Sequence, residues 1–406
     1  MQVEDHYGLL LGISSPWEIS SVDLKMEQSR VDIYVEYTDS KGKCPECGVI
    51  HPKHDNRKVR TWRHLDTMQF STFIHCQLPR VKCPDHKVKS VQAPWANKQS
   101  GFTLMFEAFA IRLLLASQSV ESARKLLKLS WHQVEAIKTQ AVDRGLSRRS
   151  KENIAYLGVD EKQFRSGHNY VSTVVDINKS AVLEVVEDRT EKACKTLLNE
   201  ALTKNQQGNV KAVCMDMWKA FKNATNELMP NAAIVHDHFH ISQYLNKAVN
   251  KIRQKEHKEL LKNKETHLIK TKYLWLTNPE NLSDDAKNKI ESLSELNLKV
   301  SEAWSLKECF KPFWEYSYKA SAKKYFDVWY EKVIESKLPE MIKVADMLKK
   351  HLDNILTYFD HSISNAKAEG LNSKIQMVKS NARGYRSFQG FRNSILFHCG
   401  KLEMEP

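Results

Sequence analysis

The chain has 406 residues, of which 41% are hydrophobic, with only 13 Gly and 11 Pro and a formal net charge of +13. This composition argues against long disordered regions, and the length predicts two to four domains. No apolar run approaches the ~18 residues of a membrane span and no signal-peptide pattern opens the chain, so we expect a soluble, cytoplasmic protein. The large positive charge favours a polyanion, such as nucleic acid, as the partner.

Residues 1–98 are predicted to form a β-rich segment and a zinc-binding domain. Residues 31–37 alternate apolar and polar side chains, as a half-buried strand does, and further strand-like runs cover 59–65 and 70–78. A C-x2-C pair precedes these two runs, and a C-x2-H pair follows them. Because Zn²⁺ takes four nitrogen or sulfur ligands in a tetrahedron, this pattern predicts a closed, structural site like that of a zinc ribbon. The predicted ligands are Cys44, Cys47, Cys83 and His86, with Cys76, His51 and His54 left open as alternatives.

Residues 99–150 change to helical periodicity and are predicted to form a helix-turn-helix region and a linker. Ser119 and Ser130 stand where N-caps are expected, and Ser130 with Gln133 fits a capping box. This pattern is typical of a DNA-binding helix-turn-helix with 131–142 as the recognition helix, although any packed helical hairpin shares it. Residues 144–151 are expected to form a basic linker. The predicted DNA contacts in this region are Arg124, Lys125, Lys128, Trp131, His132, Lys138, Arg148 and Arg149.

Residues 151–240 are predicted to form the first part of an α/β core. The order of its strands and helices is βββαβαβ, which is the order of the ribonuclease-H-like (RNase-H-like) fold. In that topology the first strand, 154–160, and the fourth strand, 210–215, lie side by side and parallel. Asp160 and Asp216 end these two apolar runs, so we expect their carboxylates to be adjacent at one edge of the sheet.

Residues 241–358 show no strand pattern and are predicted to form an all-α insertion in the core. Most of its aromatic residues are expected to belong to a helical core. Residues 359–406 are predicted to be the last part of the core, with a helix at 365–377 that carries Glu369. Six Lys or Arg residues and no acid follow between 371 and 401, which indicates an anionic ligand near that helix. The predicted DNA contacts here are Lys374, Arg383 and Arg386.

Asp160, Asp216 and Glu369 are predicted to hold two divalent metal ions, Mg²⁺ or Mn²⁺. These hard cations prefer oxygen ligands and keep open positions for phosphate and water. Two such ions can activate the attacking oxygen and stabilise the leaving one in phosphodiester chemistry. Glu161 is a rival to Asp160, because adjacent residues on a strand face opposite ways and periodicity does not say which side is inward.

Several motifs distributed along nearly the whole chain resemble those of the ISL-three family of bacterial insertion-sequence transposases, which are of the DDE type. The matching stretches are CPECG at 44–48, WRHLD at 62–66, PRVKCPDH at 79–86, LGVDE at 157–161, MDMW at 215–218, HDHFH at 236–240, AEGLNSKI at 368–375 and GYRSF at 384–388. The resemblance implies a multidomain α+β protein with a zinc-ribbon-like domain, a helix-turn-helix and an RNase-H-like core interrupted by helices. It also implies that Asp160, Asp216 and Glu369 are the catalytic triad, which favours Asp160 over Glu161. Asp237 and His240 match a D-x-x-H with a supporting role near the active site.

We therefore expect a transposase that binds terminal inverted repeats, cleaves DNA with metal-activated water and joins the freed 3′-hydroxyl to target DNA. Synapsis of two element ends suggests a homodimer or larger assembly. The first alternative is a DNA-binding regulator that retains the fold without the chemistry. The second is an RNase-H-like nuclease acting on RNA or hybrid duplexes, which the core fold alone would permit.

Overall fold

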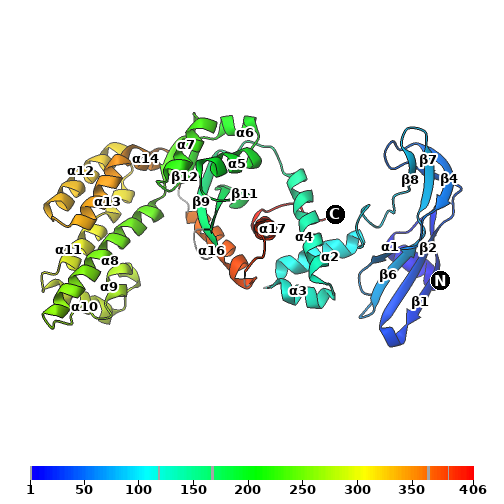
Figure 1. Ribbon diagram of the computed structural model, residues 1–406, viewed down its shortest axis with the longest axis horizontal. Helices are drawn as coiled ribbons and strands as arrows, with labels where there is room; N and C mark the ends of the chain where they lie inside the picture. The colour runs from blue at the N-terminus through cyan, green and yellow to red at the C-terminus, as the bar shows by residue number, and fades with distance from the viewer. Residues whose placement is uncertain (1, 118, 166–168, 364–365, 383) are drawn as a thin grey trace. The chain divides into compact units, whose positions relative to one another are not determined.

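The structure is a computed structural model that describes residues 2–117, 119–165, 169–363, 366–382 and 384–406 (Figure 1). The side chains of residue 165 and of residues 366–369 lie outside that description. The chain forms two compact units, Met1–Arg149 with Leu402–Pro406, and Ser150–Lys401. Within the described residues there is no helix long and apolar enough to span a membrane.

The N-terminal unit contains two four-stranded sheets. A helix that the sequence analysis did not foresee, α1 (Val3–Leu11), precedes them. The first sheet has the order β1 (Trp17–Lys25), β2 (Arg30–Tyr37), β6 (Ser71–Cys76), β5 (Arg60–Arg63). The second sheet has the order β3 (Lys41–Lys43), β4 (Ile50–Asn56), β7 (Pro79–Cys83), β8 (Lys87–Ser90). The alternation predicted for residues 31–37 is confirmed, because Val31, Ile33 and Val35 are at most 3% exposed.

The two zinc-ligand turns belong to the second sheet, whereas the hairpin between them belongs to the first. The predicted strand pair at 59–65 and 70–78 is present as the antiparallel strands β5 and β6. The sequence analysis missed β4, whose Pro52 and two histidines interrupt the usual β-branched strand pattern. β4 pairs with β3 on one side and with β7 on the other, so it connects the two halves of the ligand cluster.

Three helices complete the N-terminal unit: α2 (Leu104–Ala116), α3 (Val120–Leu127) and α4 (Trp131–Arg148). The predicted caps are confirmed. Ser119 Oγ accepts from the Ser122 N–H, and Ser130 Oγ accepts from the Gln133 N–H at 3.3 Å. In turn, Gln133 Oε1 accepts a hydrogen bond from the Ser130 N–H at 2.8 Å. These two reciprocal bonds form the capping box.

The basic linker predicted at 144–151 is wrong for most of its length, because α4 continues to Arg148. Tertiary contacts with the end of the chain explain the extra turn. Arg144 Nη1 donates to the Met404 carbonyl oxygen at 2.6 Å, and Arg148 Nη1 donates to the Glu405 carbonyl oxygen at 2.6 Å. At Gly145 a Cβ atom would lie 2.6 Å from Leu402 Cβ, so only glycine permits this close approach. Residues 402–406, which the sequence analysis grouped with the core, thus lie with the N-terminal unit.

The second unit is built on a five-stranded sheet with the order β11 (Ala181–Glu187), β10 (Asn169–Asp176), β9 (Tyr156–Arg165), β12 (Ala212–Met215), β13 (Ala233–His236). β9, β10 and β11 are antiparallel, and β12 is parallel to both β9 and β13. The predicted adjacency of the first and fourth core strands is therefore confirmed. The connecting helices are α5 (Glu191–Ala201), α6 (Lys204–Asn209) and α7 (Lys219–Leu228).

A helical region follows β13 and has a core of its own, as predicted (Figure 1). Most of its aromatic side chains are interior: Trp275, Phe313 and Phe326 are fully buried, whereas Tyr318 is 75% exposed. The helices are α8 (His238–Lys262), α9 (Lys272–Leu276), α10 (Asp284–Ser294), α11 (Lys299–Glu308), α12 (Lys319–Glu335), α13 (Pro339–Lys350), α14 (Leu352–Leu356) and α15 (Tyr358–His361).

The last two helices return to the sheet. They are α16 (Ala366–Asn381) and α17 (Phe388–Cys399). Arg392 on α17 donates to both carboxylate oxygens of Glu184 on β11, at 2.7 and 2.5 Å. Both side chains are largely buried, so this bidentate ion pair holds α17 on the edge strand of the sheet.

Candidate active site and metal centre

Asp160 and Asp216 occupy equivalent positions on neighbouring parallel strands. The last pair between β9 and β12 is Val159 with Met215, and each aspartate directly follows its member of that pair. β9 does not end at Asp160 as the sequence analysis predicted; it continues to Arg165 by pairing with β10. Asp160 therefore stands where the parallel pairing stops rather than where the strand stops, and the two aspartates follow neighbouring positions at that edge of the sheet.

Asp160 is 8% exposed and is surrounded by donors. Its Oδ2 accepts from Lys162 Nζ at 2.5 Å and from Asn372 Nδ2 of α16 at 3.0 Å, and its Oδ1 accepts from the Glu161 N–H at 2.8 Å. Burial acts to raise the pKa of Asp160, but the nearby His240 and Lys162 outweigh it and lower the pKa below its ordinary value. The group is therefore poised to remain a carboxylate.

Asp216 is less buried and has a different set of partners. Its Oδ1 accepts from the Met217 N–H at 2.7 Å, and its Oδ2 accepts from the Tyr244 hydroxyl on α8 at 3.3 Å. Burial, together with the Asp216 charge, raises the pKa of Tyr244 to about 12. Tyr244 thus remains a hydrogen-bond donor to the carboxylate at neutral pH.

Asp237 and His240 both lie at the start of α8. They differ in how they relate to Asp160 and Asp216, which we call the acid pair. Asp237, which is 3% exposed, caps α8 by accepting from the Phe239 N–H at 3.3 Å. Burial raises its pKa, and the Asp160 charge adds to that shift. His240 Nε2 lies 3.7 Å from Asp160 Oδ1. Burial lowers the pKa of His240, but Asp160, Asp216 and Asp237 raise it to a net value above the ordinary one.

The third predicted acid, Glu369, belongs to α16, and its side chain lies outside the described residues. The same helix carries Asn372, whose amide reaches Asp160 at 3.0 Å. Positions three apart share one face of a helix, so position 369 is one turn from Asn372, whose amide contacts Asp160.

Glu161, the rival to Asp160, has a different environment. It forms an ion pair with Arg189, whose Nη1 lies 3.0 Å from Glu161 Oε1. The Arg189 guanidinium also lies over the rings of Tyr170 at 4.1 Å and of Trp218 at 5.0 Å. Trp218, two residues after Asp216, is 44% exposed. Sequence reasoning missed the partners Lys162, Asn372, Tyr244 and Arg189, because nothing in their local pattern separates them from ordinary surface residues.

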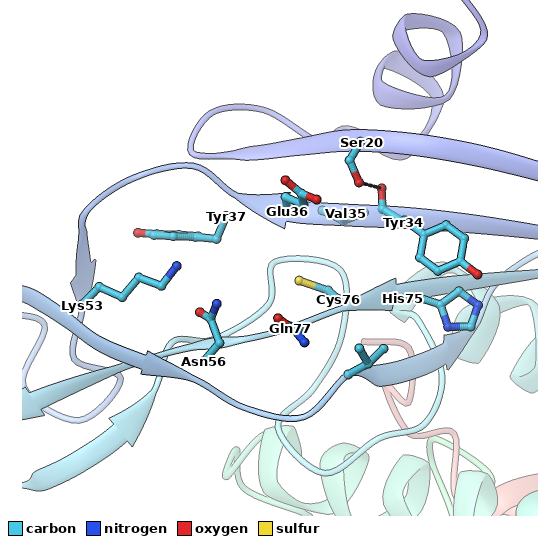
Figure 2. Close-up of a pocket in the computed structure, with 11 residues that line it drawn as sticks. Ser20, Tyr34, Val35, Glu36, Tyr37, Lys53, Asn56, His75, Cys76 and Gln77 are labelled. Atoms are coloured by element: carbon cyan, nitrogen blue, oxygen red, sulfur yellow. Dashed lines mark hydrogen bonds between the residues drawn. The ribbon is translucent and has the colours of Figure 1, made fainter.

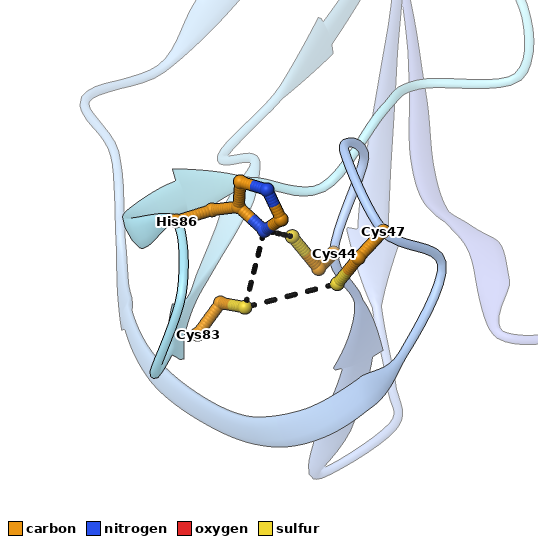
Figure 3. A group of neighbouring side chains, drawn as sticks. All are labelled: Cys44, Cys47, Cys83 and His86. Atoms are coloured by element: carbon orange, nitrogen blue, oxygen red, sulfur yellow. Dashed lines mark hydrogen bonds between the residues drawn. The ribbon is translucent and has the colours of Figure 1, made fainter.

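Cys44, Cys47, Cys83 and His86 converge in the N-terminal unit (Figure 3). Their ligand atoms all lie within 4.8 Å of one another. Thiolates bound tetrahedrally to Zn²⁺ at about 2.3 Å stand roughly 3.75 Å apart, and Cys47 Sγ lies 3.7 Å from Cys83 Sγ. Cys83 Sγ lies 3.5 Å from His86 Nδ1. The set fits a closed tetrahedral zinc site, the arrangement that the sequence analysis predicted.

Two further observations favour these four ligands. The backbone N–H groups of Cys47 and Glu46 lower the pKa of Cys44 to about 7, which favours the thiolate that a metal requires. The alternative ligand Cys76 lines a different cavity of about 310 Å³, together with Tyr34, His75 and Gln77 (Figure 2). Burial and the Glu36 charge raise the pKa of Cys76 to about 12, so it is a neutral thiol of the core.

The predicted DNA contacts have unequal environments. Lys138 is 1% exposed and pairs with Glu135 at 3.0 Å, so the structure contradicts its prediction as a surface contact. Arg124 is held by both carboxylate oxygens of Glu121 at 2.9 Å. Arg383 lies outside the described residues, and Arg149 is partly exposed. The exposed members of the set are Lys125, Lys128, Trp131, His132, Arg148, Lys374 and Arg386.

Comparison with known proteins gives matches to three family models. Residues 157–395 match the transposase model of the ISL3-type DDE group, and residues 91–142 match the helix-turn-helix domain of transposase family ISL3. Residues 40–86 match the zinc-finger of transposases IS204/IS1001/IS1096/IS1165.

Two relatives are similar over most of their length. The chain is 25% identical over 365 residues to the transposase for insertion sequence element IS1001 of Bordetella parapertussis, covering 89% of both chains. It is 24% identical over 375 residues to the transposase for insertion sequence element IS1557 of Mycobacterium tuberculosis, covering 86% of this chain and 83% of that protein. These matches agree with the resemblance that the sequence motifs carry.

Proposed function

Because the chain belongs to the ISL3 (ISL-three) family of transposases, we propose that it binds the terminal inverted repeats of an insertion sequence and catalyses metal-dependent cleavage and transfer of DNA strands. In the cleavage step, a water oxygen attacks the phosphodiester at the element end and the P–O3′ bond breaks, leaving a 3′-hydroxyl. In the transfer step, that hydroxyl attacks a target phosphodiester. One phosphodiester is exchanged for another, so the second step needs no external energy source.

The observation that carries this proposal is the position of Asp160 and Asp216 directly after the last paired residues of two adjacent parallel strands. Aspartates at neighbouring positions of one sheet edge offer the oxygen ligands that Mg²⁺ or Mn²⁺ prefers, and the donor set fits because Asp160 already attracts positive groups. Lys162 Nζ at 2.5 Å from Asp160 is the clearest of these. Asp160, Asp216 and Glu369 would hold the metal, which supplies charge stabilisation and a nucleophilic oxygen when bound.

The neighbouring side chains of the acid pair have supporting roles in this proposal. Asn372 and Tyr244 orient the two carboxylates through hydrogen bonds at 3.0 and 3.3 Å. His240, whose pKa is raised by the surrounding acids, supplies positive charge beside Asp160 and can exchange a proton. Asp237 positions His240 by capping the helix on which it lies.

The N-terminal unit supplies DNA recognition and its support. A three-residue turn separates α3 from α4, whose first turn exposes Trp131 and His132; this is the end of a recognition helix that contacts base edges. We assign a structural Zn²⁺ to Cys44, Cys47, Cys83 and His86, because four protein ligands leave no open position for substrate. The joining of two element ends requires at least two copies of the chain in one complex.

A cleavage assay on duplex DNA that carries the inverted repeats of the element tests the proposal. We expect metal-dependent nicking at the element ends, and a loss of at least about 10³-fold in Asp216→Ala, because the remaining acids cannot hold the metal in place. Glu187→Ala is the matched control, since Glu187 is an exposed acid at the end of edge strand β11 of the same sheet. Wild-type protein that cuts no better than Asp216→Ala would make the chain a DNA-binding regulator rather than an enzyme.

A further inference from the structure

A small cavity in the N-terminal unit is lined by cationic side chains from several segments. Its volume is about 270 Å³, below the roughly 300–1,000 Å³ of pockets for drug-sized ligands. Five cations line it and, among the described lining residues, no acid does. The cations are Arg57, Arg60, Arg80, Lys89 and Lys98.

The cations outnumber the acids that lie near them. Asp55 pairs with Arg80 in a bidentate ion pair. Glu46 is shared between Lys89, at 3.4 Å, and Lys98, at 3.2 Å. Five positive charges and these two negative ones leave the region with a net charge of +3, so an anion entering the cavity would be attracted.

Arg60 and Arg57 carry the positive charge that no acid balances. Arg60 Nη1 donates to the Lys98 carbonyl oxygen at 2.7 Å, and Nη2 donates to the Ser100 carbonyl oxygen at 2.5 Å. These contacts fix the guanidinium without neutralising it. Arg57 is exposed, and its guanidinium has no hydrogen-bond or ion-pair partner within the part of the chain that the structure describes. Partial burial lowers the pKa of Arg60, and the nearby Arg57 charge adds to that shift.

The floor of the cavity excludes base stacking. Trp62 lines the cavity but is fully buried, and the Arg60 guanidinium lies over its ring at 4.9 Å. The Trp62 indole N–H is buried and has no hydrogen-bond partner among the described residues. Single-strand binding sites expose aromatic faces on which bases stack, and this cavity exposes no aromatic face among its described lining residues; its cations lie beside aliphatic side chains such as Leu78 and Val88.

We propose that this cavity, which Pro45 of the Cys44–Cys47 turn helps to line, is a phosphate-binding pocket that holds the backbone of duplex DNA and is distinct from the helix-turn-helix. Guanidinium groups donate charge-assisted hydrogen bonds to phosphate oxygens. Arg57 can donate such bonds, and Arg60, whose two Nη atoms donate to backbone carbonyl oxygens, adds positive charge in the same cavity. The pocket lies in the same compact unit as α3 and α4, so it adds a sequence-independent contact to a DNA-binding unit. This inference rests on the proposed function, because it takes DNA as the ligand.

The test is the salt dependence of binding to a duplex of unrelated sequence, measured by fluorescence anisotropy with the zinc-loaded full-length chain. Removing one phosphate contact reduces the slope of log K against log salt by about 0.9. We expect that reduction in Arg57→Gln. The Arg57 side chain is exposed and has no hydrogen-bond or ion-pair partner among the described residues, and the substitution leaves its backbone N–H bond to the Leu78 carbonyl oxygen in place. This variant should therefore fold as wild type does. Arg60→Gln should show an equal or larger reduction, with thermal unfolding as the check on its folding.

The matched control is Lys58→Gln. Lys58 is an exposed neighbour of Arg57 in the same turn, carries the same charge and does not line the cavity. We expect its slope to equal that of wild type. An unchanged slope in Arg57→Gln, or equal reductions in Arg57→Gln and Lys58→Gln, would overturn the pocket.

The choice of DNA keeps this inference distinguishable from the proposed function. A duplex of unrelated sequence reports backbone contacts even in a chain that does not cleave. If the wild-type chain does not cleave repeat DNA but Arg57→Gln still shows the expected reduction in slope, only the proposed function is overturned. An active transposase with an unchanged Arg57→Gln slope would overturn the pocket alone.

Discussion

The Cys₃His cluster of the N-terminal unit and the acid pair of the second unit are constructed in different ways. The cluster takes two ligands from each of two short turns, and its four ligand atoms lie within 4.8 Å of one another. The acid pair takes one aspartate from the end of the pairing of each of two parallel strands. Its carboxylates accept hydrogen bonds from Lys162, Asn372 and Tyr244.

Under the proposed function, this difference assigns a structural role to the cluster and a catalytic role to the acid pair. Four protein ligands saturate a tetrahedral ion and leave nothing for a substrate. Carboxylates held by neighbouring side chains can exchange those partners for a metal ion, which retains open positions. We therefore expect changes at the cluster to act on stability and changes at the acid pair to act on activity.

The largest expected effect comes from removal of the zinc ligands. Structural zinc contributes on the order of 10 kcal/mol to the folding of small zinc domains, so Cys83→Ser should lose bound zinc and leave the N-terminal unit open to proteolysis. Zinc content and limited proteolysis measure this. Cys309→Ser is the control, because Cys309 is an exposed thiol outside the cluster. A Cys83→Ser protein with full zinc content and wild-type protease resistance would contradict the assignment.

A smaller effect tests whether the metal alone stabilises the N-terminal unit. Asp32 is fully buried and accepts from Arg30, Lys25 and His75, at 2.6 to 2.8 Å. Asp32→Asn should lower the free energy of unfolding by roughly 1–3 kcal/mol, because it removes the charge of a buried carboxylate that accepts from Arg30 and Lys25. Urea unfolding of the zinc-loaded protein measures the change. Asp23→Asn is the matched control: Asp23 is 52% exposed and its ion pair with Lys25 should contribute less than about 1 kcal/mol.

The loss of unfolding free energy in Asp32→Asn should depend on pH in a way that follows from the pKa of Asp32. Burial acts to raise this pKa, but Arg30, Lys25 and His75 lower it to about 2, from an ordinary value of 3.8. A folded-state pKa below the unfolded one gives stability that is fully present above about pH 4 and is lost as the pH falls towards 2. The difference in the free energy of unfolding between wild type and Asp32→Asn should therefore be constant from neutral pH to about pH 5. A difference that shrinks across that range would contradict the assigned charge state.

The smallest expected effect concerns Asn372, which donates a hydrogen bond to Asp160, and is measured as the metal requirement for cleavage. Asn372→Ala removes the hydrogen bond to Asp160 Oδ2 and should raise the metal concentration needed for cleavage about tenfold, as outer partners of metal ligands do. Cleavage at saturating metal should remain near wild type. The control is Gln376→Ala, an exposed position one turn further along α16. An equal metal requirement in Asn372→Ala and Gln376→Ala would show that Asn372 has no positioning role.

Features that depend on nearest neighbours in the chain were predictable. The caps at Ser119 and Ser130 involve residues three positions away, and each pair of zinc ligands lies within one turn. The order of the five core strands followed from local periodicity. The adjacency of Asp160 and Asp216 then followed from that order, because the topology makes their strands neighbours.

Features that depend on packing between distant segments were not predictable. Lys138 has the spacing of a surface cation, yet it is buried beside Glu135 because of how α4 packs. The continuation of α4 to Arg148 depends on contacts with residues more than 250 positions away. The same is true of Asn372, which reaches Asp160 from 212 positions along the chain.

The sequence by itself determined the ligand types, the order of the core strands and the family to which this chain belongs. The tertiary structure decided which donors surround each carboxylate, that Cys76 lies apart from the zinc ligands, and that Arg57 and Arg60 line one cavity. The physical reason is one of range. Capping, turn formation and strand alternation are set by interactions over a few residues, whereas burial and the partners of a charged side chain are set by whichever segments fold against it.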